Sequence, residues 1–191
     1  MSVSDLLARK MVEKHVIEKE EFELYQYSIN ALLELGGNII LTIIIGIVID
    51  KILPTILFLL IVVPVRSFIG GCHAKTSLGC FFMSIIVYII CVLYPSYLID
   101  IPIAICLLIV FVSGVIIYAW APVSCLEKPI SKAQSERMKR YSKISVTVLW
   151  LLSVCTCFVG NNFFLVELML IMCYFLITLI IEKKRKEGIV S

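Results

Sequence analysis

The sequence predicts an all-α membrane protein, a polytopic bundle of about six transmembrane helices preceded by an amphipathic helix at the membrane surface. Apolar residues make up 61% of the 191 residues and charged residues only 16%, more apolar character than the core of a soluble domain of this size needs. The apolar residues form long runs with few charges between them, as segments that cross a bilayer do. The runs lack the polar and apolar alternation of barrel strands.

The length suits a single integral membrane domain over residues 1–191. A run of roughly 17 to 25 apolar residues is long enough to cross the hydrocarbon layer as a helix. Candidate spans are 31–49, 52–65, 78–98, 101–121, 144–160 and 163–181. The second candidate is the shortest and contains Pro54 and Pro64. We therefore expect it to be a tilted or broken helix, or the return limb of a hairpin with the first span.

Three charged segments flank these spans. In residues 1–30, apolar side chains such as Leu7, Met11 and Phe22 recur about every four positions, which predicts a helix on the cytoplasmic membrane surface. Residues 122–143 form a basic cytoplasmic loop, and a capping-box pattern predicts a helix that starts near Lys132 and runs into the fifth span. Residues 182–191 form a tail.

The distribution of Lys and Arg predicts the orientation in the cell membrane. Basic residues precede the first span, follow the second, lie between 128 and 143, and close the chain at 183–186, whereas Lys51 falls on the other side. The positive-inside rule therefore places both termini in the cytoplasm. The charged start predicts no removable signal peptide. Most of the eight cysteines lie in spans or on the cytoplasmic side, so we expect reduced thiols.

The polar segment 66–80, "RSFIGGCHAKTSLGC", contains groups that suit cysteine acyl chemistry. An imidazole such as His73 can take the proton of a thiol such as Cys80, and the thiolate attacks carbonyl carbon. In one straight helix these residues would lie about 10 Å apart, whereas proton transfer needs about 3 Å. Because Gly70 and Gly71 permit a turn, we expect His73 on a loop. Cys80 would lie in the first turn of the third span, where the helix N-terminus stabilises a thiolate.

Other interpretations of this segment stay open. Cys72 is a competing nucleophile, which we rank below Cys80 because neighbouring side chains point apart in regular structure. Both cysteines also suit plain packing, and the histidine suits a polar loop. Glu167 is the carboxylate expected deepest in the apolar layer, but we assign no third catalytic residue. We expect no metal site, no cofactor and no nucleic-acid partner.

The segment from Arg66 to Cys80, the "AP" at 121–122 and the "KP" at 128–129 resemble the accessory gene regulator B (AgrB) family of Gram-positive quorum-sensing systems. The resemblance covers nearly the whole chain. It implies a membrane-embedded cysteine endopeptidase, with His73 as general base and Cys80 as nucleophile. Arg66, Gly70 and Gly71 match positions that shape the site.

The resemblance also implies a substrate and partners. The substrate would be an AgrD-type precursor peptide that loses its C-terminal tail, and the acyl-enzyme thioester would then be displaced to close a thiolactone or lactone. The other partners implied are membrane lipid and a second copy in a homodimer. Basic residues of the second segment have two interpretations, a site for the acidic tail or an anchor to anionic lipid; they are Lys128, Lys132, Arg137 and Lys139.

Two other functions compete with this interpretation. A peptide transporter suits the six spans, but the sequence has no detectable inverted repeat. A non-enzymatic membrane scaffold would use segment 66–80 as a connecting loop. A reactive Cys80 that depends on His73 would favour the enzyme over both.

Overall fold

The computed structural model describes residues 3–69, 77–121 and 132–190, without the side chains of 69, 77–78, 80, 132–135 and 186–190. Within these ranges the regular elements are helices, which confirms the predicted all-α fold. They are α1 (Val3–Glu13), the short 3-10 helix η1 (Lys19–Glu21), α2 (Phe22–Val48), α3 (Ile52–Ile69), α4 (Ser77–Leu93), the 3-10 helix η2 (Tyr94–Ser96), α5 (Ile103–Trp120), α6 (Lys132–Val159) and α7 (Asn162–Val190).

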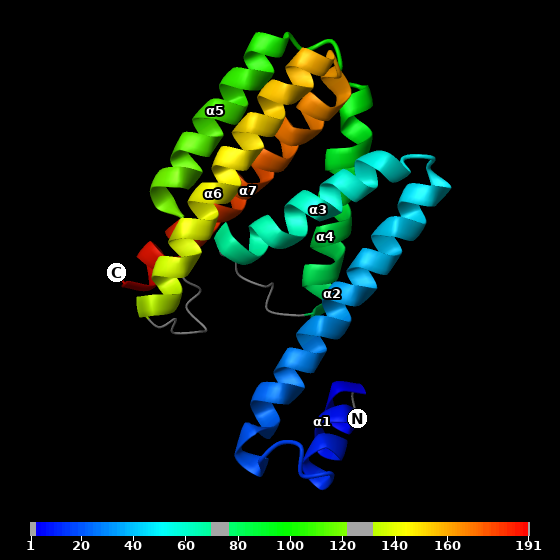
Figure 1. Cartoon of the computed structure of the whole chain (residues 1–191), viewed down its shortest axis with the longest axis vertical. Helices are drawn as coiled ribbons and strands as arrows, with labels where there is room; N and C mark the ends of the chain where they lie inside the picture. The colour runs from blue at the N-terminus through cyan, green and yellow to red at the C-terminus, as the bar shows by residue number, and fades with distance from the viewer. Residues whose placement is uncertain (1–2, 70–76, 122–131, 191) are drawn as a thin grey trace.

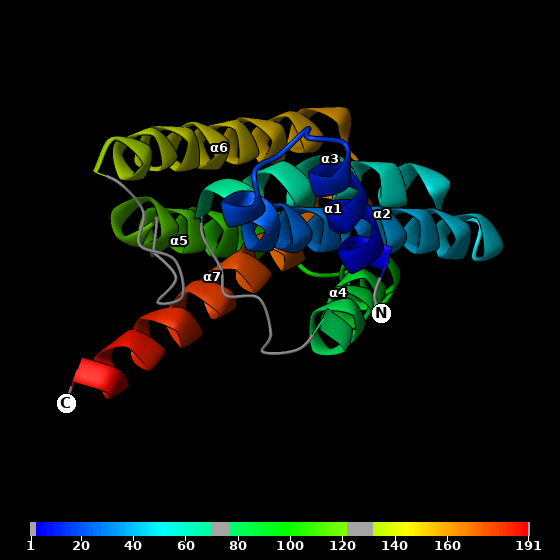
Figure 2. The ribbon, with the colours of Figure 1, turned by 90° about the horizontal axis from the view of Figure 1, so that it is seen from below.

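Helices α3 to α7 form the bundle, and the N-terminal half of α2 extends beyond it together with α1 (Figure 1). Helices α5, α6 and α7 pack along one another, and α3 crosses between them and α4. Figure 2 shows α5 and α7 beneath α6, with α4 on the opposite side from α5. The buried core is made almost wholly of aliphatic, aromatic and sulfur side chains from α3, α4, α5, α6 and α7.

In the part of the chain that the structure describes, four helical segments have the length and hydropathy of a membrane span: Lys19–Val48, Ile103–Trp120, Glu136–Val159 and Asn162–Arg185. Helices α3 and α4 are also apolar but shorter. The 18 residues of α3 rise about 27 Å at 1.5 Å per residue, slightly less than the thickness of a hydrocarbon core of about 30 Å. The chain is thus a multi-pass membrane protein, and the six-span topology stays a prediction.

The N-terminal region differs from the prediction of one surface segment over residues 1–30. Helix α1 ends at Glu13, His15 adopts a positive φ of 54°, and α2 then runs unbroken from Phe22 through the predicted boundary. Ser4 and Ala8 of α1 are buried, and the Ser4 hydroxyl donates to Asn30 of α2 at 3.4 Å. Because these small side chains allow close approach, α1 folds back along α2. The predicted boundary near residue 30 rested on the charged character of the residues before it. Charged side chains do not break a helix, so α2 continues through this boundary.

The second predicted span is an unbroken helix that returns along the first. A short turn at 49–51 joins α2 to α3, and Asp50 in this turn has a φ of 54°. Gly46 of α2 packs directly on the Thr55 side chain. Pro64 lies within α3 without ending it, and the helix continues to Ile69. Of the alternatives left open, the structure therefore selects the hairpin limb.

Candidate functional site

One end of the bundle gathers the ends of five helices. Helices α3, α5 and α7 end there, and α4 and α6 begin there (Figure 1). We call it the basic end, because it carries Arg66, Arg137, Lys143 and Lys183. The opposite end carries Lys51, whose ammonium lies 5.0 Å from the centre of the Phe163 ring. All the helix termini next to segments 66–80 and 122–143 therefore lie at the same end.

Arg66 connects the last turn of α3 to α4. Its Nη1 atom donates a hydrogen bond to the Ser84 hydroxyl at 3.5 Å, and both side chains are half-buried. Ser84 lies one helical turn after position 80, and residues four apart in a helix share a face. The guanidinium of Arg66 is thus held against the face of α4 that includes position 80.

Position 80 lies in the first turn of α4, as the sequence predicted, because α4 begins at Ser77. The N-terminus of a helix carries a partial positive charge, which favours a nearby anion such as a thiolate. The side chain of Cys80 lies outside the described residues. So do the whole residues His73, Gly70, Gly71 and Cys72.

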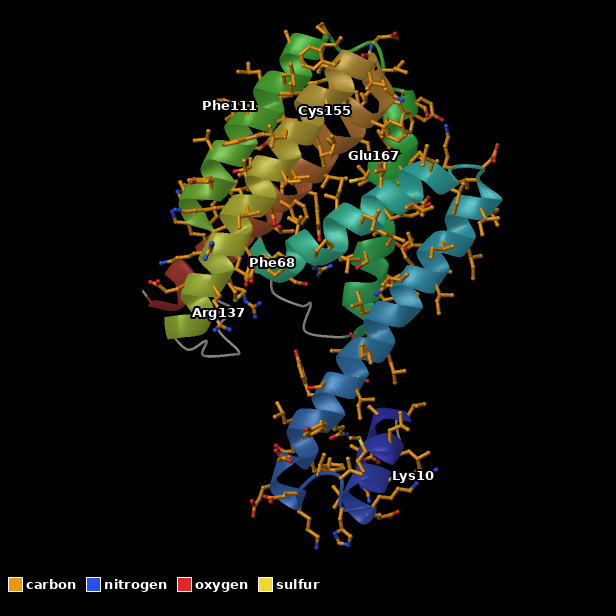
Figure 3. The ribbon with its side chains drawn as sticks, viewed as in Figure 1. Lys10, Phe68, Phe111, Arg137, Cys155 and Glu167 are labelled. Carbon is orange, nitrogen blue, oxygen red and sulfur yellow. The ribbon has the colours of Figure 1, made fainter. Side chains whose placement is uncertain are left out.

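The basic segment adjoins the end of α3. Helix α6 begins at Lys132 and runs without interruption to Val159, as expected from the capping-box pattern. Tyr141 of α6 stacks on Phe68 of α3, with ring centroids 5.0 Å apart. Arg137, one turn before Tyr141, is exposed, as is Lys139. Figure 3 places Arg137 beside the end of α3 at which Phe68 lies. Lys128 and the Lys132 side chain lie outside the described residues.

Two cation–π contacts tie α5 to its neighbours at the basic end. The Lys143 ammonium of α6 lies 4.8 Å from the centre of the Tyr118 ring. The Lys183 ammonium of α7 lies 3.7 Å from the centre of the Trp120 ring. Such contacts contribute about 0.5 to 2 kcal/mol each. They hold the start of α6 and the end of α7 in place, and with them the basic side chains around the site.

Glu167 lies far from this site. It is in the second turn of α7, 2% exposed, and within electrostatic range of Cys91 of α4. Cys91 follows position 80 by eleven residues, which is about 16 Å along the helix axis. Glu167 therefore lies about three helical turns from position 80 along α4.

Neither Ser84 nor the pair Phe68 and Tyr141 was predicted from the sequence. Ser84 was detectable, because the i, i+4 rule places it beside Cys80 once the third span is taken as a helix. The aromatic pair joins residues 73 positions apart in sequence, and no local pattern signals such a contact. Among the described residues, no group of three His, Cys, Asp or Glu side chains is placed to hold a metal ion.

Comparison with known proteins identifies relatives over most of the chain. The family model for accessory gene regulator B matches residues 4–184. An AgrB-like protein 2 of Clostridium perfringens (strain 13, Type A) is 28% identical over 161 residues, which are 80% of this chain and 75% of that protein. An AgrB-like protein of Clostridium perfringens (strain SM101, Type A) is 28% identical over 155 residues, 77% and 72% of the two chains. No solved structure matches.

Proposed function

The chain belongs to the accessory gene regulator B family, which acts in quorum sensing, and from this premise we propose that it is a membrane-embedded cysteine endopeptidase. Its substrate is an AgrD-type precursor peptide, whose C-terminal tail it removes. The site faces the cytoplasm, where the positive-inside rule places the basic end. His73 is the general base and Cys80 is the nucleophile.

The reaction proceeds through an acyl-enzyme. The His73 imidazole takes the thiol proton of Cys80, and the thiolate attacks the carbonyl carbon of the scissile peptide bond. The tetrahedral intermediate collapses when the amine of the tail leaves with a proton from the imidazolium. The remaining peptide is held on the Cys80 sulfur as a thioester.

Cyclisation needs no further energy source, because the thioester retains much of the free energy of an activated acyl group. A thiol or hydroxyl side chain of the bound peptide gives its proton to the His73 imidazole and attacks the thioester carbonyl, and the Cys80 thiolate leaves. The product is a thiolactone or a lactone. Water would compete for the same carbonyl, so a site at the edge of an apolar bundle favours ring closure over hydrolysis.

The observation that carries this proposal is the contact at the basic end between the described parts of segments 66–80 and 122–143. The Phe68–Tyr141 stack attaches the basic start of α6 to the helix that leads into segment 66–80. An acidic tail attracted to Arg137 and Lys139 would therefore lie near the end of α3, which leads into segment 66–80. Attraction between opposite charges is stronger at the edge of a low-dielectric bundle than in bulk water.

The test is co-expression of the protein with its cognate tagged precursor, followed by mass spectrometry of the peptide. We expect the tail to be lost with the wild type and retained with Cys80→Ala or His73→Ala. Cys155→Ala is the matched control, because Cys155 is an exposed cysteine of α6, remote from the start of α4, and should leave processing unchanged. Retention of the tail with the wild type, or its loss with Cys80→Ala, would contradict the proposal.

Thiol labelling distinguishes the enzyme from a transporter or scaffold. A catalytic Cys80 should react with iodoacetamide at neutral pH much faster than the other cysteines, and His73→Ala should remove that advantage. A transporter or scaffold has no reason to activate this thiol. Equal labelling of Cys80 and Cys155 in the wild type would favour one of these alternatives.

A further inference from the structure

The contact between Arg66 and Ser84 places a positive charge against α4, one helical turn after position 80. Arg66 Nη1 donates to the Ser84 hydroxyl at 3.5 Å. In sequence, Arg66 and Ser84 lie on either side of the segment that contains His73 and Cys80. This hydrogen bond therefore bridges the two helices that flank the segment.

An arginine near the end of a membrane helix, such as Arg66, can also extend its side chain toward water. Long basic side chains near the end of a membrane helix extend toward water, which lowers the cost of keeping a charge near lipid. The basic end is the nearer water phase for Arg66, which lies in the last turn of α3. A polar acceptor on α4 opposes this movement, because it satisfies a guanidinium N–H at the helix face.

Ser84 is such an acceptor for Arg66. It interrupts the otherwise apolar run from Phe81 to Val87, and it shares a face with position 80, one turn away. A hydroxyl in an apolar helix adds no favourable burial of its own. In its contact with Arg66, this hydroxyl accepts a hydrogen bond from the guanidinium.

We propose that Ser84 is a positioning residue, which holds the Arg66 guanidinium beside the first turn of α4 and thereby favours the thiolate form of Cys80. This inference rests on the proposed function, in which Cys80 is the nucleophile. A nearby cation increases the thiolate fraction of a cysteine at neutral pH, and it adds to the effect of the helix N-terminus. Ser84 acts through Arg66 and does not touch the reacting atoms.

Other charged groups on the helices packed against α4 do not take this role. Glu167 of α7 interacts with Cys91, three turns further along α4. Glu34 of α2 accepts a hydrogen bond from Asn30 of its own helix at 2.6 Å. His73 and Lys75 precede α4 in the chain, and they are unchanged in every variant below that tests Ser84. The effect of Ser84 is therefore separable from theirs.

The experiment measures the rate of Cys80 alkylation against pH, with full-length protein in detergent micelles. The peptide that contains Cys80 is quantified by mass spectrometry after pulses of iodoacetamide, and Cys155 serves as the internal reference. In Ser84→Ala we expect the midpoint of the pH profile to move upward by about one pH unit, with about a tenfold slower reaction at neutral pH. Ser84→Thr keeps the hydroxyl and should retain the wild-type profile.

Two further comparisons separate positioning from a general loss of structure. Ser67→Ala is the matched control, because Ser67 neighbours Arg66 in α3 but donates to the Val63 carbonyl at 3.1 Å; it should not move the midpoint. The pair Ser84→Thr and Ser84→Val differs in the hydroxyl at nearly constant shape, and it decides the question if the alanine variant folds poorly. Arg66→Gln should move the midpoint as Ser84→Ala does, and the double variant should move it little further.

The outcomes also separate this inference from the proposed function. An unchanged midpoint in Ser84→Ala, or full additivity with Arg66→Gln, overturns the positioning role while Cys80→Ala still abolishes processing. If Cys80 of the wild type shows no enhanced alkylation and Cys80→Ala still processes the precursor, the proposed endopeptidase function with Cys80 as nucleophile is wrong.

Discussion

The hydroxyl groups of Thr55 and Tyr88 lie 2.8 Å apart in the bundle interior and join α3 to α4. Both side chains are fully buried. The Thr55 hydroxyl also donates to the Lys51 carbonyl at 2.7 Å. A hydroxyl has one proton, so Tyr88 is the donor in the bond between the two side chains.

This polarity predicts an asymmetric response to mutation. Thr55→Val removes the acceptor of a buried Tyr88 hydroxyl and should lower the free energy of unfolding by about 1 to 3 kcal/mol. Tyr88→Phe leaves the Thr55 proton bonded to the Lys51 carbonyl, so its cost should be about 1 kcal/mol or less. Thermal unfolding of the two variants in the same detergent measures the difference. A larger loss for Tyr88→Phe would contradict the assigned polarity.

Close packing of α2 on α3 predicts opposite effects for two glycines of the same helix. A Cβ atom at Gly46 would overlap the Thr55 side chain, whereas a Cβ atom at Gly36 would meet nothing within 4 Å. Gly46→Ala should therefore lower the midpoint of thermal unfolding, at a cost of about 1 to 3 kcal/mol.

Gly36→Ala is the matched control for this prediction, because both variants gain the same helix propensity in α2. It should leave stability unchanged or raise it by up to about 1 kcal/mol. Equal shifts in the unfolding midpoint for the two variants would show that α2 does not pack on Thr55 as described.

The sequence predicted the helices well where long apolar runs and polar breaks coincide. The fourth predicted span, 101–121, became α5 (Ile103–Trp120), and the basic helix did continue into the fifth span. The start of α2 at Phe22 was not predictable from hydropathy. The ends of a helix depend on backbone conformation and capping, and the appearance of charged residues does not by itself end a helix. The charged residues after Phe22 are good helix formers.

For the candidate site, local features were predicted from the sequence, but contacts between distant segments were not. The apolar run after Gly79 predicted Cys80 at a helix start, and the charge pattern predicted two basic segments on one side. The contact of Phe68 with Tyr141 and that of Arg66 with Ser84 depend on how α3 crosses α6 and α4. Crossing geometry comes from packing between distant segments, which a single sequence does not encode locally.

The buried carboxyl group of Glu167 predicts a stabilising mutation. Glu167 is 2% exposed, and neither carboxyl oxygen has a hydrogen-bond partner among the residues that the structure describes. Burial of a polar group without a partner costs free energy. Glu167→Leu should therefore raise the unfolding midpoint, by about 1 to 3 kcal/mol of stability. Glu34→Leu is the control: it loses the hydrogen bond from Asn30 and should not raise the unfolding midpoint. A lower midpoint in Glu167→Leu would reveal a structural role for the carboxyl group.

Charge reversal on α6 tests whether the basic end attracts the precursor tail. Arg137 and Lys139 are exposed, and each exposed ion pair with an acidic tail would contribute about 0.2 to 1 kcal/mol. The triple variant Lys132→Glu, Arg137→Glu and Lys139→Glu should therefore process the precursor about tenfold more slowly. High salt should slow the wild type more than the variant, because screening weakens attraction that the variant has already lost.

Two controls make this prediction specific to α6. Lys184→Glu reverses an exposed charge near the end of α7, at the same end of the bundle, and should leave the processing rate within about twofold of the wild type. A precursor whose acidic tail residues are replaced by Lys should be processed better by the triple variant than by the wild type, because the reversed charges then attract each other. Processing by the triple variant at the wild-type rate would remove tail recognition from α6 and leave lipid anchoring as the explanation of its charge.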